Sequence, residues 1–155
     1  MPPREANALK VRIRRSRVVG QGLECTTSFK KDQVITYYML RVHKRAGYRV
    51  SEYAMDVHTP SGNVSGTLLG DLAPAHGPYR GIPHWGHLVN EARSRGEVNV
   101  YYHFGKHAQL KSGDLVRCAV RASRPLSRGE MLLADYGPNY YRSWESSLHA
   151  LTTES

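Results

Sequence analysis

Apolar and polar residues alternate along most of this chain in short runs, a pattern that predicts β-strands. In several runs the apolar side chains recur at about every second position, which places them on one face of a strand, and residues 34–40 and 97–104 are predicted as strands from their β-branched and aromatic content. The runs are at residues 9–19, 23–29, 34–40, 48–59, 97–104, 114–126 and 131–137. Residues 85–96 and 138–151 are compatible with short helices. The pattern therefore predicts a mostly β protein with little helix.

Glycine and proline mark the connections between these runs. The glycines at Gly20–Gly22 predict a tight turn. Residues 70–86 carry four glycines and three prolines and predict a long loop, which in a compact domain usually has a function. We expect a single domain from residue 9 to 147. We expect the ends, residues 1–8 and 148–155, to be flexible.

The positive charge of the chain is concentrated in its first third. The formal net charge is +9; residues 1–49 hold 12 Lys and Arg against three Asp and Glu, and the rest hold ten of each sign. A localised basic field attracts nucleic acid. A solvated basic face that keeps the protein soluble is an equally good interpretation. The charge therefore indicates DNA contact through the first third without establishing it.

Cysteine, histidine and hydropathy patterns exclude several classes of protein. Cys25 and Cys118 are the only cysteines, too few for a disulfide framework, and reduced thiols are the expectation. The eight histidines form no zinc signature with them, so we expect no metal site. No long apolar run or signal peptide is visible. We expect an intracellular protein, nuclear if it acts on chromatin.

Three segments, in this order, resemble the SET-domain family. "SRVVGQGLEC" resembles the opening strand, Gly-x-Gly and strand of the family. "HLVNEARSRGEVNVYY" is similar to its Asn-His-Ser-Cys-x-Pro-Asn segment, and "LSRGEMLLADYGPNYY" to its Gly-Glu-Glu-Leu-Thr-x-x-Tyr-Gly ending. The likeness spans about residues 10–145, and looks closest to the short stand-alone SET proteins of large DNA viruses.

The resemblance implies a fold, a reaction and a cofactor. The fold would be a SET fold of several small β-sheets with a pseudoknot-like threading of the C-terminal stretch. The reaction would be transfer of a methyl group from S-adenosylmethionine to a protein lysine, with a histone tail as the default substrate. Family positions that bind the cofactor correspond to Gly20, Gln21, Gly22, Leu23, Asn90, Glu91, Tyr136, Tyr140 and Trp144.

Tyr136 is the residue to which the resemblance assigns catalysis. Its hydroxyl would lie beside the line of methyl transfer and orient the lysine amine. Tyr38 and Tyr102 correspond to aromatic positions that line the lysine channel, which suits a cationic amine on an aliphatic stem. Tyr37 and Tyr101 are the alternatives, because neighbouring strand residues point to opposite faces and only one of each pair can serve.

Partners and alternative functions follow from the same positions. The acidic residues available to bind a basic peptide are Asp56, Asp71, Glu91, Glu97 and Asp114. Short viral SET proteins imply a homodimer. Glu91 stands where the family has histidine, which leaves open a catalytically inactive SET-fold binding module. The basic charge and interleaved tyrosines leave open a non-enzymatic nucleic-acid- or chromatin-binding β-domain.

Overall fold

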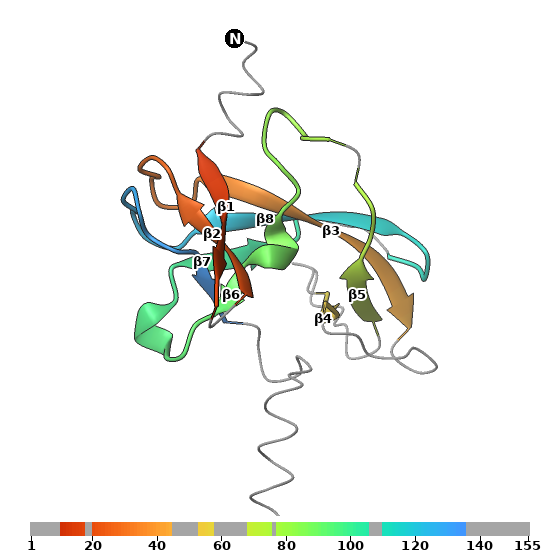
Figure 1. Cartoon of the computed structure of the whole chain (residues 1–155). Coiled ribbons are helices and arrows are strands. Elements are labelled where there is room, and N and C mark those ends of the chain that lie inside the picture. The colour runs from red at the N-terminus through yellow and green to blue at the C-terminus, as the bar shows by residue number, and fades with distance from the viewer. Residues whose placement is uncertain are drawn as a thin grey trace, which may run out of the picture.

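The computed structural model describes residues 10–17, 20–44, 53–57, 68–75, 77–105 and 110–135. Within these ranges the chain is built from short strands, and its only helices are two single 3-10 turns. The strands form a two-stranded hairpin, a five-stranded sheet and a small parallel pair (Figure 1). The prediction of a mostly β chain with several small sheets is therefore confirmed.

The five-stranded sheet forms the largest part of the described chain. Its order is β4 (Met55–Asp56), β5 (Leu68–Leu72), β3 (Val34–Lys44), β8 (Leu115–Ala122) and β7 (Val100–His103). The neighbouring strands are antiparallel, and β3 and β8 are paired along most of their length. Because β3 is central and longest, it positions the side chains on both faces of the sheet.

The two smaller pairings bring distant segments together. Strand β1 (Val11–Ser16) pairs with β2 (Gly20–Cys25), and Glu24 on the other edge of β2 bridges Met131. Strand β6 (Asn90–Glu91) pairs in parallel with β9 (Leu133–Ala134). These strands gather toward one end of the large sheet, while β4 and β5 lie at the other end (Figure 1). The segments that resemble the SET family are therefore neighbours in space.

Two apolar clusters support this arrangement. One combines side chains of β1, β2, β3, β7, β8 and β9 with side chains of the connecting segments, and it includes the fully buried Leu23 and Leu132. The other joins the inner face of β3 to β4 and β8, and includes Tyr38, Leu40 and Val116. Alternate residues of β3 enter these clusters, as period-two burial requires.

Several local predictions are wrong. Gly20–Gly22 is not a turn, because β2 begins at Gly20 and pairs from there with β1. Residues 70–86 are not entirely loop, since Leu68–Leu72 forms β5. Residues 85–96 do not form a helix. They contain the 3-10 turns η1 (Gly86–Leu88) and η2 (Arg95–Glu97), with β6 between them.

No helix in the described part of the chain is long and apolar enough to cross a membrane.

Cys25 and Cys118 are buried free thiols. Burial, together with nearby Glu130 and Glu24, raises the pKa of Cys25 to about 11. Burial raises that of Cys118 to about 12. Both thiols are therefore protonated at neutral pH, and they fill space in the core.

Candidate functional site

Gly22 and Asn90 lie directly against each other. A Cβ added to Gly22 would be 2.7 Å from Asn90 Nδ2 and 2.8 Å from Met131 Cε. These distances are shorter than real Cβ contacts, so a side chain at position 22 would have to displace its neighbours. Glycine at position 22 therefore lets the Asn90 amide and the Met131 methyl group lie against the backbone of β2.

The side-chain amide of Asn90 is available for a ligand. Asn90 is half-buried, and its side chain makes no hydrogen bond to any described residue. Its backbone is extended in β6, opposite Leu133. Asn90 therefore caps neither a helix nor a turn in the described structure. An unpartnered amide offers one group that donates and one that accepts hydrogen bonds.

The other cofactor positions predicted near the first glycine segment have different surroundings. Gly20 has a positive φ of 73°, and nothing lies within 4 Å of an added Cβ. Glycine is therefore favoured here by the backbone conformation and not by close packing. Gln21 is exposed. The side chain of Leu23 is fully buried, and its carbonyl accepts a hydrogen bond from Leu132 N–H at 2.8 Å. Leu23 therefore anchors β2 to the segment that leads into β9.

Asn99 holds β9 in place, a role that the sequence did not reveal. It is 2% exposed, its Nδ2 donates to the carbonyl of Met131 at 2.8 Å, and its Oδ1 accepts from Leu133 N–H at 2.7 Å. Its own N–H donates to the Leu133 carbonyl at 3.0 Å. The buried side-chain amide thus satisfies two backbone groups, and the backbone N–H of Asn99 satisfies a third, in the segment that leads into the short strand β9. The polar Asn99 between Val98 and Val100 was the available signal.

Strand β9 leads directly to the predicted catalytic tyrosine. Ala134 pairs with Glu91, and its carbonyl accepts a hydrogen bond from Ala92 N–H at 2.9 Å. The described chain ends at residue 135. Tyr136, Tyr140 and Trp144 therefore lie outside the described residues, and their roles stay predictions. So does the threading of the C-terminal stretch.

Tyr38 and Tyr102 lie together in a cluster of four rings, which we call the tyrosine cluster: Tyr38, Tyr53, His87 and Tyr102. The ring centroids of Tyr38 and Tyr102 are 6.4 Å apart in an edge-to-face arrangement. The ring of His87 meets those of Tyr38 at 6.3 Å and Tyr53 at 5.9 Å. The Tyr38 hydroxyl donates to the Tyr53 carbonyl at 2.7 Å. Such a group of aromatic rings suits an alkylammonium side chain.

The alternative tyrosines have other partners. The Tyr37 ring contacts Tyr79 and His84 on the other face of β3. The Tyr101 hydroxyl donates to the Asp32 carboxylate at 2.8 Å. Burial, with this hydrogen bond second, raises the pKa of Tyr101. The structure thus groups Tyr38 with Tyr102 and leaves Tyr37 and Tyr101 outside the tyrosine cluster.

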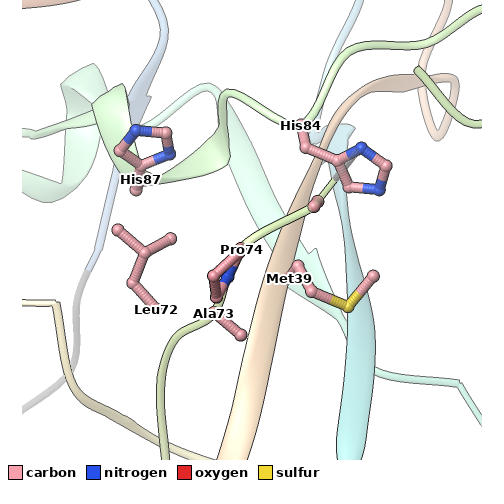
Figure 2. Close-up of a pocket in the computed structure, with 7 residues that line it drawn as sticks. Met39, Leu72, Ala73, Pro74, His84 and His87 are labelled. Carbon is pink, nitrogen blue, oxygen red and sulfur yellow. The ribbon is translucent and has the colours of Figure 1, made fainter. Parts of the chain in front are cut away.

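A pocket of about 350 Å³, which we call the β3-edge pocket, adjoins the tyrosine cluster. It opens where the chain leaves β5 and returns toward η1, and Figure 2 shows His84 and His87 at its two ends with Ala73 and Pro74 between them. Its lining residues are Met39, Leu72, Ala73, Pro74, Ala75, His84 and His87. Since His87 also belongs to the tyrosine cluster, the two sites share a wall.

Both histidines of the pocket are held neutral by their surroundings. Burial is the main cause that lowers the pKa of His84 and of His87. His84 Nδ1 lies 2.9 Å from the Gly77 carbonyl, and its Nε2 accepts from Arg117 Nε at 3.1 Å, an arrangement that places the proton on Nδ1. Among the described residues no group of His, Cys, Asp and Glu could hold a metal ion.

The basic first strand is partly neutralised by a buried carboxylate. Glu24 is 4% exposed, and Arg12 Nε donates to its Oε1 at 2.7 Å. Arg14 binds the other carboxylate oxygen. The hydrogen bond from Arg14, with those from Arg12, lowers the pKa of Glu24 despite burial. Arg15 and Arg17, by contrast, are exposed and have no carboxylate partner among the described residues.

The acidic residues predicted to bind a basic peptide have local partners. Asp71 Oδ1 accepts from Leu72 N–H at 2.8 Å, and Asp114 Oδ2 accepts from Lys111 N–H at 2.8 Å. Glu97 accepts a long hydrogen bond from Ser94 at 3.4 Å. The side chain of Asp56 lies outside the described structure. The contacts of Glu97 and Asp114 lie in turns, and that of Asp71 lies at the end of β5.

Comparison with known proteins identifies the fold. No family model and no curated protein matches this sequence. The structure is similar to the candidate histone methyltransferase PFL0690c of Plasmodium falciparum, with a TM-score of 0.54 and 17% identity over 84% of this chain and 100% of that chain. It is also similar to KRYPTONITE in complex with mCHG DNA and SAH, with a TM-score of 0.55 and 18% identity over 86% of this chain and 24% of that chain. At these identities the likeness establishes the SET fold.

Proposed function

We propose that the protein is a protein-lysine N-methyltransferase that uses S-adenosylmethionine and acts on a histone tail. The observation that supports this most is the meeting of Gly22, Asn90 and strand β9. It joins the three segments whose sequences resemble the SET family. The neighbouring tyrosine cluster offers a place for a lysine side chain close to that junction.

The residues of the junction fit the cofactor. The Asn90 amide is unpartnered and presents both a donor and an acceptor, as the amino and carboxylate groups of a methionine moiety require. Gly22 leaves the space in which that amide lies. When bound, S-adenosylmethionine supplies an electrophilic methyl group. By resemblance, Tyr136 orients the lysine amine, and Tyr140 or Trp144 covers the adenine.

The tyrosine cluster prepares the lysine for transfer. The rings of Tyr38 and Tyr102 bind the aliphatic stem and exclude water from its amine. Removing the ammonium group from water lowers its pKa, so the proton can leave to solvent before transfer. A neutral amine in this position would be able to form a bond to the methyl group of bound S-adenosylmethionine as the S–CH3 bond breaks and S-adenosylhomocysteine leaves. Positioning and desolvation are therefore the contributions of this chain.

Two other functions have specific support. Glu91 in place of the family histidine favours an inactive SET-fold module that binds the cofactor without turnover. Exposed Arg15 and Arg17 favour contact with DNA in a nucleosome, beside the enzyme activity or instead of it.

We also propose a nuclear or host-nuclear location and a homodimer, on the resemblance to short viral SET proteins alone.

A labelled-methyl assay on core histones tests the proposal. Wild-type protein should transfer label to histone lysine, and Tyr136→Phe should reduce the rate by at least about tenfold. Isothermal titration with S-adenosylhomocysteine separates the alternatives. Binding without transfer to histones or to a lysine-peptide library would indicate an inactive module. The absence of both would leave a nucleic-acid-binding domain and end the methyltransferase proposal.

A further inference from the structure

The β3-edge pocket has a mostly apolar, uncharged lining and shares His87 with the tyrosine cluster. Its lining has no Lys, Arg, Asp or Glu, and its volume of about 350 Å³ is at the small end for ligand pockets, which suits a side chain rather than a whole cofactor. His87 forms one of its walls and contacts Tyr38 and Tyr53. Leu72 forms another and packs on the same core cluster as Tyr38. A group in this pocket therefore lies beside a side chain held in the tyrosine cluster.

An uncompensated cation lies at the rim of this pocket. Arg117 on β8 is the cross-strand partner of Met39, which lines the pocket. Its guanidinium lies 3.8 Å from the centroid of the Tyr79 ring, and its Nε donates to His84. It is half-buried, and no carboxylate pairs with it among the described residues. Partial desolvation of an unpaired charge is unfavourable and favours an incoming anion.

We propose that the β3-edge pocket and Arg117 form a second substrate subsite, which takes an apolar side chain near the target lysine and a carboxylate beside it. This inference rests on the proposed function, because it places the lysine in the tyrosine cluster. An extended peptide advances about 3.3–3.6 Å per residue, so the two recognised residues lie within a few positions of the lysine. The substrate class is therefore a lysine with an apolar and an acidic neighbour.

The chemistry of the pocket favours this occupant over others. A basic side chain would have to approach the guanidinium of Arg117 and two neutral imidazoles, with no carboxylate in the lining. Arg117 is held in position by Tyr79 and His84, so little side-chain freedom is lost when a carboxylate binds. Apolar contact in the pocket and a charge-assisted hydrogen bond at its rim would act together.

Peptide binding to the full-length protein tests the subsite. The probes are fluorescein-labelled peptides with one central lysine, in which Leu and Glu are placed at each of the four positions on either side. Anisotropy is measured in the presence of S-adenosylhomocysteine. At the best positions, changing Leu to Ala or Glu to Gln in the peptide should each weaken binding by about tenfold.

Protein variants assign these two preferences to the two parts of the subsite. Arg117→Gln should remove the preference for Glu and keep that for Leu, whereas Ala75→Phe should fill the pocket and remove the preference for Leu. Arg121→Gln is the matched control, since Arg121 lies on the same face of β8 outside the pocket, and should change neither. If a variant fails to fold, the peptide substitutions on wild-type protein decide the question.

The possible results separate this inference from the proposed function. Binding or methylation that is indifferent to Leu and Glu overturns the subsite and leaves the methyltransferase proposal standing. Selective peptide binding without methyl transfer supports the subsite and counts against the activity. A dimer in sedimentation that Ala75→Phe dissociates would show that a second copy fills the pocket and would overturn the subsite.

Discussion

The amide of Asn90 occupies the space that a side chain at Gly22 would need. An added Cβ would lie 2.7 Å from Asn90 Nδ2. One residue comes from the hairpin near the start of the chain, and the other from β6 in its second half. Their contact defines the part of the candidate cofactor site that the structure describes.

Gly22→Ala should weaken cofactor binding because it displaces this amide. The Met131 methyl and the Asn90 side chain are both mobile groups, so we expect the protein to remain folded. The dissociation constant for S-adenosylhomocysteine, measured by isothermal titration, should rise by at least about tenfold. Gly96→Ala is the control, since nothing lies within 4 Å of its added Cβ. Equal affinity in the two variants would contradict the site.

Asn99→Ala should lower the stability of the protein, whereas Asn90→Ala should lower its affinity for the cofactor. Asn99→Ala leaves the Met131 carbonyl and the Leu133 N–H without their side-chain partner, and we expect the free energy of unfolding to fall by about 2–5 kcal/mol. Asn90→Ala removes an amide that has no partner in the described structure, so it should change the free energy of unfolding by less than about 0.5 kcal/mol. Urea unfolding measures both. Cofactor affinity, measured on folded protein, should fall mainly in Asn90→Ala.

Tyr38→Phe should weaken binding of a lysine peptide while cofactor affinity stays unchanged. The substitution removes the hydroxyl that donates to the Tyr53 carbonyl, which costs about 1 kcal/mol and loosens the tyrosine cluster. Peptide anisotropy and titration with S-adenosylhomocysteine make the comparison. Tyr101→Phe is the control, because the Tyr101 hydroxyl donates to Asp32 outside the tyrosine cluster. A larger effect on peptide binding from Tyr101→Phe would assign the lysine site to the other register.

Glu24→Gln should destabilise the protein at neutral pH and much less in acid. Because hydrogen bonds from Arg14 and Arg12 lower the pKa of Glu24 in the folded state, its ionisation stabilises the fold above the usual value of 4.5. This contribution is lost as the pH falls from there through the lowered pKa. The melting temperatures of wild type and variant should therefore begin to approach each other below about pH 4.5 and become equal only below the lowered pKa of Glu24. Exposed Glu97→Gln should show little difference at any pH.

Arg15→Gln with Arg17→Gln should weaken DNA binding without loss of stability. Both side chains are exposed and have no carboxylate partner in the described structure. Each lost phosphate contact should reduce the slope of log K against log salt by about 0.9. Arg12→Gln with Arg14→Gln should instead lower the melting temperature, because Glu24 loses its partners. An unchanged salt slope in the first double variant would remove the DNA proposal.

Alternation of apolar residues was enough to predict a mostly β chain, because a strand with one buried face needs only this period. The order of the three short segments was enough to suggest the fold that the structural comparison then supported. Side-chain alternation also placed Tyr38 and Tyr37 on opposite faces of one strand, and Tyr102 and Tyr101 on opposite faces of another. It could not predict which tyrosine of the first strand contacts which tyrosine of the second. These features depend on neighbouring residues, and neighbouring residues are what a sequence displays.

Long-range pairing decided the rest. Residues 85–96 look locally like a helix, yet Asn90 and Glu91 pair with Leu133 and Ala134 from the far end of the chain, and those bonds outweigh local propensity. The same is true of Asn99, whose partners are remote backbone groups. The half-burial of Arg117 beside an apolar pocket is likewise a property of packed strands. Such contacts form only when segments that are distant in sequence pack against each other and exclude water, and a local pattern of residues does not specify which segments do so.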